Sequence, residues 1–434
     1  MDYQEAMAYI EQLNKKGISL GLERMEALLQ YLDNPQNDLR IIHVAGTNGK
    51  GSVCAFIESA LQQAGLRIGR YISPSVYDYL ERFQINGVYM DTQTFSILLS
   101  DVQVACAQME QHGLELPTAF EVETAIAFLY FKQAKCDYVL LEVGMGGRLD
   151  STNVITHPVL SVITSISMDH TGMLGNTLGE IAAEKAGIIK ESCPVVLAWQ
   201  KPEAMNVLLE KCKECHIEPI IADPLQQYDP EWNIYGQSFS YKDWKQVHIG
   251  LIGQYQQMNA IVALEALWVI QEWEPLLYDD AIRQGLLNAR WPGRFEVILH
   301  KPLLIVDGAH NPAGAQALVD TIKYIPKEDY AKCWLLMGVF ADKEYKKIGQ
   351  IMSDCSDTLI CFKPSGDRGL KADKLAETMQ QYYSNVIIEE NAATAVKYVL
   401  EHASDGDMII SFGSLSTIKM VEDAVALWEV AHNV

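Results

Sequence analysis

From residue 39 onward, short runs of aliphatic and β-branched residues alternate with longer stretches at helical spacing. Residues 39–45, 137–144, 158–166 and 193–199 are apolar runs closed by a turn or a charged residue, which is typical of strands buried in a parallel sheet. Strands that alternate with helices form sheets covered by helices. The pattern therefore predicts an α/β protein with a mainly parallel, doubly wound sheet.

A second alternating series follows residue 296, with strand-like runs at 303–309, 332–340, 357–362, 385–390 and 407–413. Between the two series, Trp291, Pro292 and Gly293 interrupt helical and strand patterns alike. A chain of 434 residues also favours two domains over one. We expect a phosphate-binding domain at 1–295 and a smaller Rossmann-like α/β domain at 296–434.

Composition limits the classes of partner. The chain has 34 Lys and Arg against 56 Asp and Glu, a formal net charge of −22, which disfavours nucleic acid. The N-terminal residues lack the basic start and apolar stretch of a secretory signal, and the apolar run 260–270 is too short for a membrane span and contains Glu265. The nine cysteines show no disulfide framework. We expect a cytoplasmic monomer that acts on small molecules.

The segment Gly46–Ser52 (GTNGKGS) stands between a predicted strand and a predicted helix that starts near Ser52. Its glycines allow backbone N–H groups to turn toward phosphate, Lys50 supplies a positive charge, and the helix adds its dipole. The spacing departs from the common P-loop because Gly51 separates Lys50 from Ser52. A glycine-rich turn without a ligand is the alternative, and the order of strand, loop and helix disfavours it.

Three further residues carry possible chemistry. Glu142 ends one predicted strand and His170 follows another, and ligands of open α/β sheets gather at the carboxyl ends of strands. A carboxylate there suits magnesium, although Glu142 could equally accept loop N–H groups, and a lone histidine is more often packed or exposed. Lys185, within a predicted helix, would ordinarily be a solvated residue.

The loop GTNGKGS resembles the nucleotide loop of the Mur ligase superfamily, and in particular that of folylpolyglutamate and dihydrofolate synthases. Other segments resemble the same family in the same order, across residues 19 to 414. These are SLGLER (19–24), SPSVYDYLERFQING (73–87), PTAFEVETA (117–125), LEVGMGGRLDSTN (141–153), SMDHTGMLG (167–175), IAAEKAGIIK (181–190), GQYQQMNAIVA (253–263), WPGRFE (291–296), DGAHNPAGA (307–315) and SFGS (411–414).

The resemblance implies roles for particular residues. The ATP-binding residues would be Gly46, Thr47, Asn48, Gly49, Lys50, Gly51, Ser52, Asn259, Arg294 and Asp307. Two magnesium ions would be held by Ser73, Glu142, His170 and a carbamylated Lys185. Lys50, Lys185, Arg294 and His310 would be catalytic, and His310 and Ser414 would bind glutamate. The folate-binding residues would be Leu22, Glu23, Arg24, Phe120, Glu121, Leu149, Asp150 and Ser151.

The resemblance also implies an activity, the ATP-dependent addition of L-glutamate to folates through an acyl phosphate. The SLGLER and PTAFEVE segments favour an additional activity on dihydropteroate. Two segments depart from the family, SPSV from the commoner SPHL and GSLS from the commoner GSLY. The alternatives are a cell-wall Mur ligase, disfavoured because the phosphate loop begins as early as Gly46, and a non-catalytic nucleotide-binding regulator.

Overall fold

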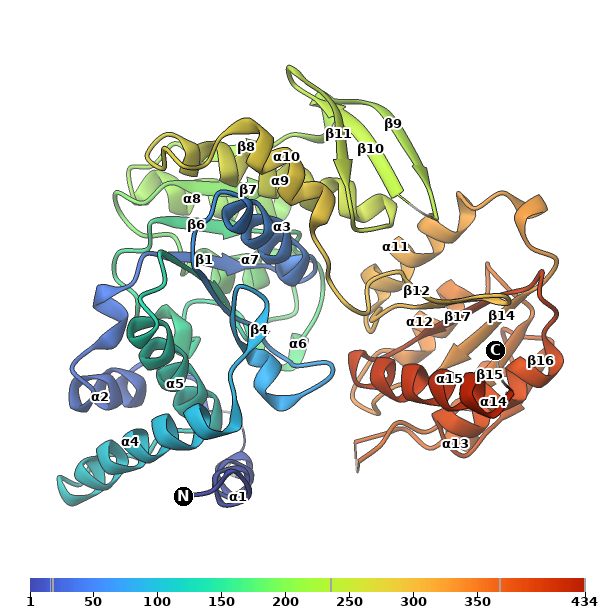
Figure 1. The fold of residues 1–434 in the computed structure, drawn as a ribbon, viewed down its shortest axis with the longest axis horizontal. Helices are drawn as coiled ribbons and strands as arrows, with labels where there is room; N and C mark the ends of the chain where they lie inside the picture. Colours follow the sequence, from blue (N-terminus) through green and yellow to red (C-terminus); the bar gives the residue numbers. More distant parts are fainter. Residues whose placement is uncertain (16, 18, 235, 367, 433–434) are drawn as a thin grey trace. The chain divides into compact units, whose positions relative to one another are not determined.

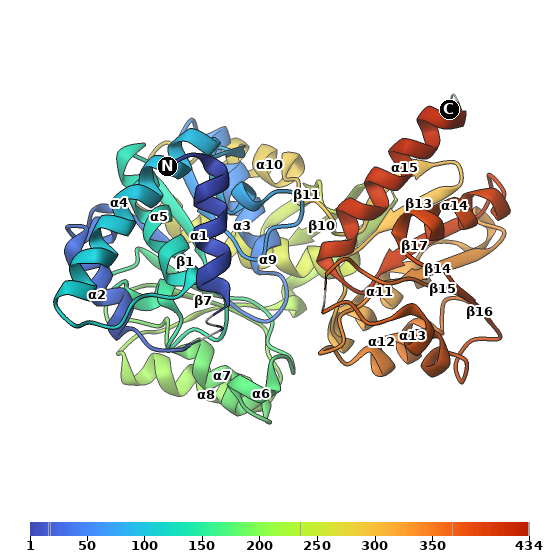
Figure 2. The ribbon, with the colours of Figure 1, turned by 90° about the horizontal axis from the view of Figure 1, so that it is seen from below.

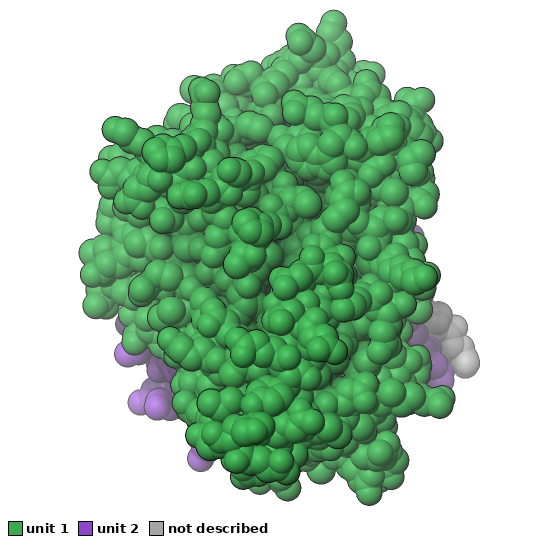
Figure 3. All heavy atoms as spheres, turned by 90° about the vertical axis from the view of Figure 1, so that its left-hand side faces the viewer, with its two compact units in different colours: residues 1–228, 241–247, 258–289 green, residues 229–240, 248–257, 290–434 purple. Residues whose placement is uncertain are grey.

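The computed structural model describes residues 1–15, 17, 19–234, 236–366 and 368–432. The chain forms two compact units, which Figure 3 shows in different colours. Unit 1 comprises residues 1–228, 241–247 and 258–289, and unit 2 comprises residues 229–240, 248–257 and 290–434. The chain thus passes between the units several times before residue 290. A domain boundary after residue 295 stays a prediction.

Unit 1 is built on an eight-stranded sheet with the order β4-β3-β2-β5-β1-β6-β7-β8 (Figure 1). Its strands are β1 (Ile41–Ala45), β2 (Ile68–Tyr71), β3 (Phe83–Ile85), β4 (Val88–Tyr89), β5 (Tyr138–Glu142), β6 (Leu160–Ile163), β7 (Val195–Ala198) and β8 (Ile220–Ala222). The six strands from β2 to β8 in this order pair in parallel, whereas β3 and β4 form an antiparallel edge. The mainly parallel sheet predicted from the sequence is confirmed.

Helices of unit 1 complete two hydrophobic clusters against this sheet (Figures 1 and 2). One cluster joins α1, α2, α4 and α5 to β1, β2 and β5, and the other joins α7 and α8 to β1, β6 and β7. The helices are α1 (Tyr3–Asn14), α2 (Glu23–Tyr31), α3 (Lys50–Gln63), α4 (Thr92–Gln111), α5 (Ala119–Gln133), α6 (Thr171–Leu174), α7 (Leu178–Ala186), α8 (Pro202–Glu214), α9 (Gln254–Gln271, shared with unit 2) and α10 (Asp279–Asn288).

Unit 2 has a six-stranded sheet with the order β12-β13-β17-β14-β15-β16, parallel except for β12. Its strands are β12 (Glu296–His300), β13 (Leu303–Val306), β14 (Cys333–Met337), β15 (Thr358–Cys361), β16 (Asn385–Ile388) and β17 (Met408–Phe412). Its helices are α11 (Pro312–Lys323), α12 (Tyr345–Met352), α13 (Ala372–Met379), α14 (Ala392–His402) and α15 (Ile418–His432). A small third sheet contains β9 (Gln227–Asn233), β10 (Gly236–Tyr241) and β11 (Trp244–Ile249).

One helix boundary differs from the expectation. The helix after the glycine-rich loop begins at Lys50, two residues before Ser52, with Gly49 as its N-cap in the left-handed region at φ 89°. Lys50 and Gly51 are therefore the first residues of α3. Within the described part of the chain, no helix is both long and apolar enough to cross a membrane.

Candidate active site

Four neighbouring parallel strands of unit 1, in the order β2-β5-β1-β6, end beside one another. Ser73 follows β2, Glu142 is the last residue of β5, Gly46 follows β1, and His170 lies in the segment after β6. The carboxyl ends of parallel strands share one edge of a sheet, which is where open α/β folds bind ligands. The fold therefore brings the phosphate loop and three of the predicted metal ligands to the same edge.

The loop after β6 braces the phosphate loop. Thr47 N donates to Ser165 O at 2.8 Å, and Thr164 Oγ1 donates to Asn48 O at 2.8 Å. Gly46 lies so close to Thr164 that a Cβ at this position would overlap the threonine hydroxyl. Because the Thr47 N–H is used inside the protein, the groups that an anion could use here are the N–H groups of the first turn of α3, since first-turn N–H groups have no acceptor within a helix.

Asn259 of α9 lies against the phosphate loop, within unit 1. A Cβ on Gly49 would overlap its side-chain oxygen, so a side chain at this position would displace the asparagine amide. The structure thus brings Asn259 to the loop with which the sequence had associated it.

Two lysines meet at the carbonyl of Gly46. Lys185 Nζ donates to Gly46 O at 2.9 Å and Lys50 Nζ to the same oxygen at 3.3 Å. Lys50 Nζ also lies 3.6 Å from Glu142 Oε1. Lys185 is only 4% exposed, and burial, with the nearby charge of Lys50, lowers its pKa to about 7. The Lys185 amine is therefore partly neutral at physiological pH, and the solvated helix position expected from its sequence context alone is wrong.

The other predicted metal ligands differ in their surroundings. Glu142 is buried, Ser73 is half-buried, and His170 is exposed as the N-cap of α6 with φ 49°. The described residues contain no group of three or more His, Cys, Asp and Glu side chains placed to hold a metal. Glu142 is thus a buried carboxylate at this edge, and its Oε1 lies 3.6 Å from the Lys50 ammonium.

The loop after β5 packs against the end of α7 beside Lys185. Arg148 N donates to Glu184 O at 2.7 Å, and the Arg148 guanidinium pairs with the Glu184 carboxylate at 2.7 Å. A Cβ on Gly147 would come 2.8 Å from Glu184 O and 3.1 Å from Lys185 Cα. These contacts were missed in the sequence, although the two adjacent glycines at 146 and 147 signal a close backbone approach.

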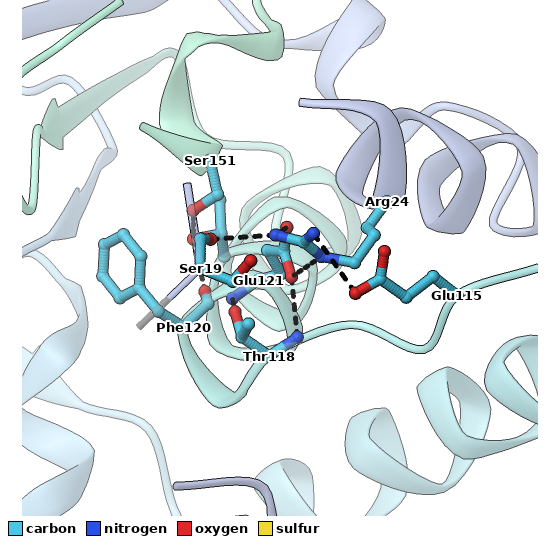
Figure 4. A network of polar contacts seen from close by, with 8 residues as sticks. Ser19, Arg24, Glu115, Thr118, Phe120, Glu121 and Ser151 are labelled. Atoms are coloured by element: carbon cyan, nitrogen blue, oxygen red, sulfur yellow. Dashed lines mark hydrogen bonds and ion pairs between the residues drawn. The ribbon is translucent and has the colours of Figure 1, made fainter. Parts of the chain in front are cut away.

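Arg24 is held by a buried ion pair among the predicted folate-binding residues (Figure 4). Its guanidinium lies 3.2 Å from Glu121 Oε1 and donates from Nε to Oε2 at 3.2 Å, while Nη2 donates to Ser19 O at 2.8 Å. Glu121 also caps α5, because its Oε2 accepts from Thr118 N at 2.6 Å. The Arg24–Glu121 pair therefore joins the start of α2 to the start of α5.

Phe120 and Ser151 come from different elements and lie near one another (Figure 4). Phe120 stacks on Tyr71 with a centroid distance of 6.0 Å, and its ring leaves no room for a Cβ on Gly144. Ser151 Oγ lies 3.1 Å from Thr124 Oγ1 on α5. The structure thus brings the aromatic ring of Phe120 to the loop after β5.

The remaining predicted folate residues border this region. Gly21 N donates to Leu149 O at 3.4 Å, which places the SLGLER segment, with Leu22 and Glu23, beside the loop after β5. Asp150 is buried and its carboxylate accepts from Met145 N, Thr152 N and Thr152 Oγ1. Asp150 therefore stabilises the loop through hydrogen bonds within the protein, which form without a ligand.

In unit 2, Asp307 follows β13 and organises the neighbouring backbone. Its Oδ2 accepts from Tyr255 Oη at 2.9 Å and from Phe295 N at 2.9 Å, and its Oδ1 accepts from Ala309 N at 2.8 Å. Burial raises the pKa of Asp307, and the charge of Arg294 opposes that rise. Tyr255 was not among the predicted site residues, although it lies in the segment GQYQQMNAIVA (253–263) that carries part of the resemblance.

Arg294, His310 and Ser414 lie near the ends of β13 and β17, which are parallel neighbours. His310 Nδ1 lies 2.8 Å from Gly308 O, so this nitrogen carries the proton and a neutral ring has its acceptor at Nε2. Ser414 caps the 3-10 turn Leu415–Thr417. The sequence-predicted residues of unit 2 thus gather at one sheet edge, as those of unit 1 do.

The Arg24–Glu121 pair can be separated from the helix cap by substitution. Glutamine at position 121 can still cap α5, whereas alanine removes the cap and takes the buried carboxylate away from the Arg24 guanidinium. We expect Glu121→Ala to lower the free energy of unfolding by about 3–5 kcal/mol, and Glu121→Gln by clearly less. Urea unfolding followed by circular dichroism measures both.

Glu115 provides the control for that comparison, because it also faces Arg24, at 3.5 Å, yet its side chain is 74% exposed. Glu115→Ala should change the free energy of unfolding by at most about 1 kcal/mol. Equal losses for Glu121→Ala and Glu115→Ala would show that the buried pair does not hold these segments.

Comparison with protein families identifies both halves of the chain. Residues 44–267 match the Mur ligase middle domain, and residues 293–415 match the Mur ligase glutamate ligase domain. The first match includes the phosphate loop, Glu142, His170, Lys185 and Asn259. The second includes Arg294, Asp307, His310 and Ser414.

Whole-chain relatives and solved structures agree with these matches. The chain is 35% identical to the dihydrofolate synthase/folylpolyglutamate synthase of Bacillus subtilis, over 95% of this chain and 96% of the relative. The folylpolyglutamate synthase of Mycobacterium tuberculosis, solved with ADP and AMPPCP, superimposes with a TM-score of 0.87 at 28% identity, covering 98% of this chain and 99% of the other. Escherichia coli FolC, solved with DHPP and ADP, superimposes with a TM-score of 0.86 at 29% identity, covering 99% of each chain. The chain therefore belongs to the folylpolyglutamate synthase/dihydrofolate synthase family of the Mur ligase superfamily.

Proposed function

We propose that this protein is an ATP-dependent ligase that joins the amino group of L-glutamate to the carboxylate of a folate, and also to that of dihydropteroate. The observation that carries the proposal is the meeting of Lys50, Lys185 and Glu142 at the Gly46 end of the phosphate loop, within a chain of this family. A phosphate site with a buried carboxylate beside it is what phosphoryl transfer to a substrate carboxylate requires.

The nucleotide would bind with its phosphates at the first turn of α3. The N–H groups of this turn and the Lys50 ammonium provide positive charge there, and Asn259 closes the loop beside Gly49. The solved relatives with ADP bound support a nucleotide site in this family. We also propose a role in nucleotide binding for Arg294 and Asp307, which the family resemblance implies.

The proposed metal ligands can hold magnesium if Lys185 does not carry a positive charge. Magnesium takes oxygen ligands and is commonly held by one or two carboxylates together with substrate phosphates. Glu142 supplies one carboxylate, and Ser73 and His170 follow neighbouring strands. A charged Lys185 would repel the metal, whereas a carbamate on Lys185 would add a second carboxylate. We propose that Glu142, Ser73, His170 and carbamylated Lys185 hold two magnesium ions, which would offset charge on the phosphoryl oxygens.

The reaction would proceed in two steps. The substrate carboxylate attacks the γ-phosphorus of ATP, which forms an acyl phosphate and releases ADP. The amine of glutamate then attacks the acyl carbon, the amide forms and phosphate leaves. Lys50 and Arg294 would neutralise the transferring phosphoryl group, because an ammonium and a guanidinium can offset charge on phosphate oxygens. His310 and Ser414 would orient the incoming glutamate.

The acceptor would lie where the loop after β5 meets α2 and α5. Phe120 offers a ring for a pterin to stack on, and Leu22, Glu23, Arg24, Glu121, Leu149, Asp150 and Ser151 border it. A protein that works on folates, ATP and glutamate is expected in the cytoplasm, and we propose that it acts there as a monomer.

Replacement of Lys50 tests the phosphate site. Lys50→Ala should lower kcat/KM by a factor of roughly a hundred or more, because the ammonium stabilises charge that develops in the transition state. The melting temperature should change little, since Lys50 Nζ contacts loop carbonyls and the Glu142 carboxylate and not an apolar side chain. Wild-type turnover in this variant would contradict the assignment of residues 46–52 as the phosphate loop.

The order of events can be tested with hydroxylamine. ATP and a folate without glutamate should form an acyl phosphate, which hydroxylamine traps as a hydroxamate that mass spectrometry detects. A reaction lacking ATP is the control, and it should give no hydroxamate. Normal turnover with glutamate, together with no trapped hydroxamate, would show that the carboxylate is not activated in this way.

The state of Lys185 can be tested directly. Carbon dioxide reacts with a neutral amine, and the lowered pKa of about 7 makes that form available. Two unit charges about 4 Å apart repel by about 4 kcal/mol at an effective dielectric constant of about 20, so the ammonium form would oppose metal binding. We expect a carbamate carbon signal from wild-type protein in ¹³C-labelled bicarbonate, and no such signal from Lys185→Ala.

Enzyme activity should depend on carbamylation of Lys185. Below about pH 7 the Lys185 amine becomes protonated, so activity at limiting bicarbonate should fall as the pH decreases through this value. Lys185→Ala should be nearly inactive and partly restored by excess formate or acetate, whereas Lys185→Arg should not be restored because its guanidinium keeps a positive charge. A fully active wild-type enzyme without the carbamate signal would contradict this role.

A further inference from the structure

His43 lies in the middle of β1, in a position that is completely shielded from solvent. The sheet register places it between Leu141 of β5 and Ser161 of β6. Alternate residues of a strand face the same side, so His43 faces the side of Ile41 and Ala45. Ile41 belongs to the cluster of α2, α4 and α5, and Ala45 belongs to the cluster of α7 and α8. His43 is therefore a polar residue at the boundary between two hydrophobic clusters.

A chain of hydrogen bonds leads from His43 to the loop after β5. His43 Nε2 lies 2.9 Å from Thr152 Oγ1, and Thr152 Oγ1 lies 2.6 Å from Asp150 Oδ1. The carboxylate accepts, so the single hydroxyl proton of Thr152 points to Asp150. The hydroxyl oxygen can then only accept from the imidazole. This fixes His43 as the tautomer that carries its proton on Nε2.

The second ring nitrogen of His43, Nδ1, does not take part in this chain of hydrogen bonds. Among the residues that the structure describes, His43 Nδ1 has no hydrogen-bond partner. Burial, and to a smaller extent the charge of Lys190, lowers the pKa of His43 to about 3, so the ring is neutral at physiological pH. A leucine would fill this position without burying an unpaired acceptor. The contribution specific to the imidazole is the proton it donates to Thr152.

The same chain extends to the proposed acceptor site. The Asp150 carboxylate also accepts from Met145 N at 2.8 Å, which closes the loop after β5. Ser151, between Asp150 and Thr152, lies 3.1 Å from Thr124 Oγ1, and Thr124 Oγ1 donates to Phe120 O at 2.7 Å. A shift of Thr152 would therefore be transmitted to Ser151 and to the first turn of α5.

We propose that His43 is a positioning residue for the folate acceptor, because its Nε2–H fixes the Thr152 hydroxyl and thereby the Asp150–Thr152 turn and Phe120. This inference rests on the proposed function. His43 does not touch the acceptor, and it lies on the same strand that leads into the phosphate loop, so its effect on acceptor binding must be separated from an effect on ATP.

Matched substitutions distinguish the effect of the His43–Thr152 hydrogen bond from the effect of side-chain volume. His43→Leu and Thr152→Val remove the hydrogen bond, whereas His43→Gln places an amide N–H near the position of Nε2 and Thr152→Ser keeps the hydroxyl. We expect His43→Leu and Thr152→Val each to raise the KM for tetrahydrofolate or dihydropteroate about tenfold, the size of one net hydrogen bond, with a change in the KM for ATP below about twofold. His43→Gln and Thr152→Ser should lie much closer to wild type, and the double variant His43→Leu/Thr152→Val should be no worse than either single variant.

Tyr138→Phe is the control for a general loss of stability. Tyr138 is equally buried, and its hydroxyl donates to Glu274 at 3.0 Å from the first residue of β5, at the amino-terminal end of the strand. Loss of this hydroxyl should lower the melting temperature while leaving the KM for the folate unchanged. A KM that follows stability in all variants would overturn the inference.

The tautomer gives a readout that is independent of activity. Nitrogen-15 NMR of histidine-labelled protein should show His43 neutral and protonated at Nε2, and Thr152→Val should alter this signal. A protonated ring, a proton on Nδ1, or a wild-type KM for the folate in His43→Leu would each overturn the inference alone. A wild-type protein inactive with every folate would instead overturn the proposed function, and with it the acceptor role of His43.

Discussion

Lys50 and Lys185 place two amino groups on one carbonyl oxygen, that of Gly46, where the Lys185 side chain is buried and Lys50 is partly buried. Burial, and after it the like charge of Lys50, lowers the pKa of Lys185 and so favours loss of its proton. The Gly46 carbonyl can approach Lys185 because Gly46 itself packs against Thr164 with no room for a side chain. The geometry of the phosphate loop and the reactivity of Lys185 are thus consequences of the same close packing.

The parallel sheet makes this meeting possible. Strands β2, β5, β1 and β6 are distant in sequence and adjacent in the sheet, so residues 46, 73 and 142 reach one edge without any of them being close along the chain. The loop after β5 then covers Lys185 through Arg148 and Gly147 and continues to Asp150 and Ser151. One loop therefore borders both the proposed metal site and the proposed acceptor site, which links activation of the carboxylate to its placement.

The strands of the two parallel sheets could be predicted from the sequence more completely than the tertiary contacts between segments. The apolar runs that became β1, β5, β6, β7 and β17 were found because strands buried on both faces show no alternation. Strand β9, which contains Asp229, Pro230 and Glu231, was missed because its residues are largely exposed and polar. The glycine-rich loop and Glu142 could be located from strand ends, whereas the burial of Lys185 could not, since a helix of Ile181–Ala186 composition reads as partly solvated until the packing of the loop after β5 is known.

Catalysis as proposed here requires that ATP be consumed only to activate the acceptor. The most direct test incubates the purified protein with ATP, magnesium and L-glutamate, offers tetrahydrofolate and dihydropteroate separately, and measures ADP release together with the mass of the product. We expect one ADP for each glutamyl residue added, with ADP release dependent on the folate. ADP release that is unaffected by the folate, or consumption of ATP with no gain of a glutamyl mass, would contradict it.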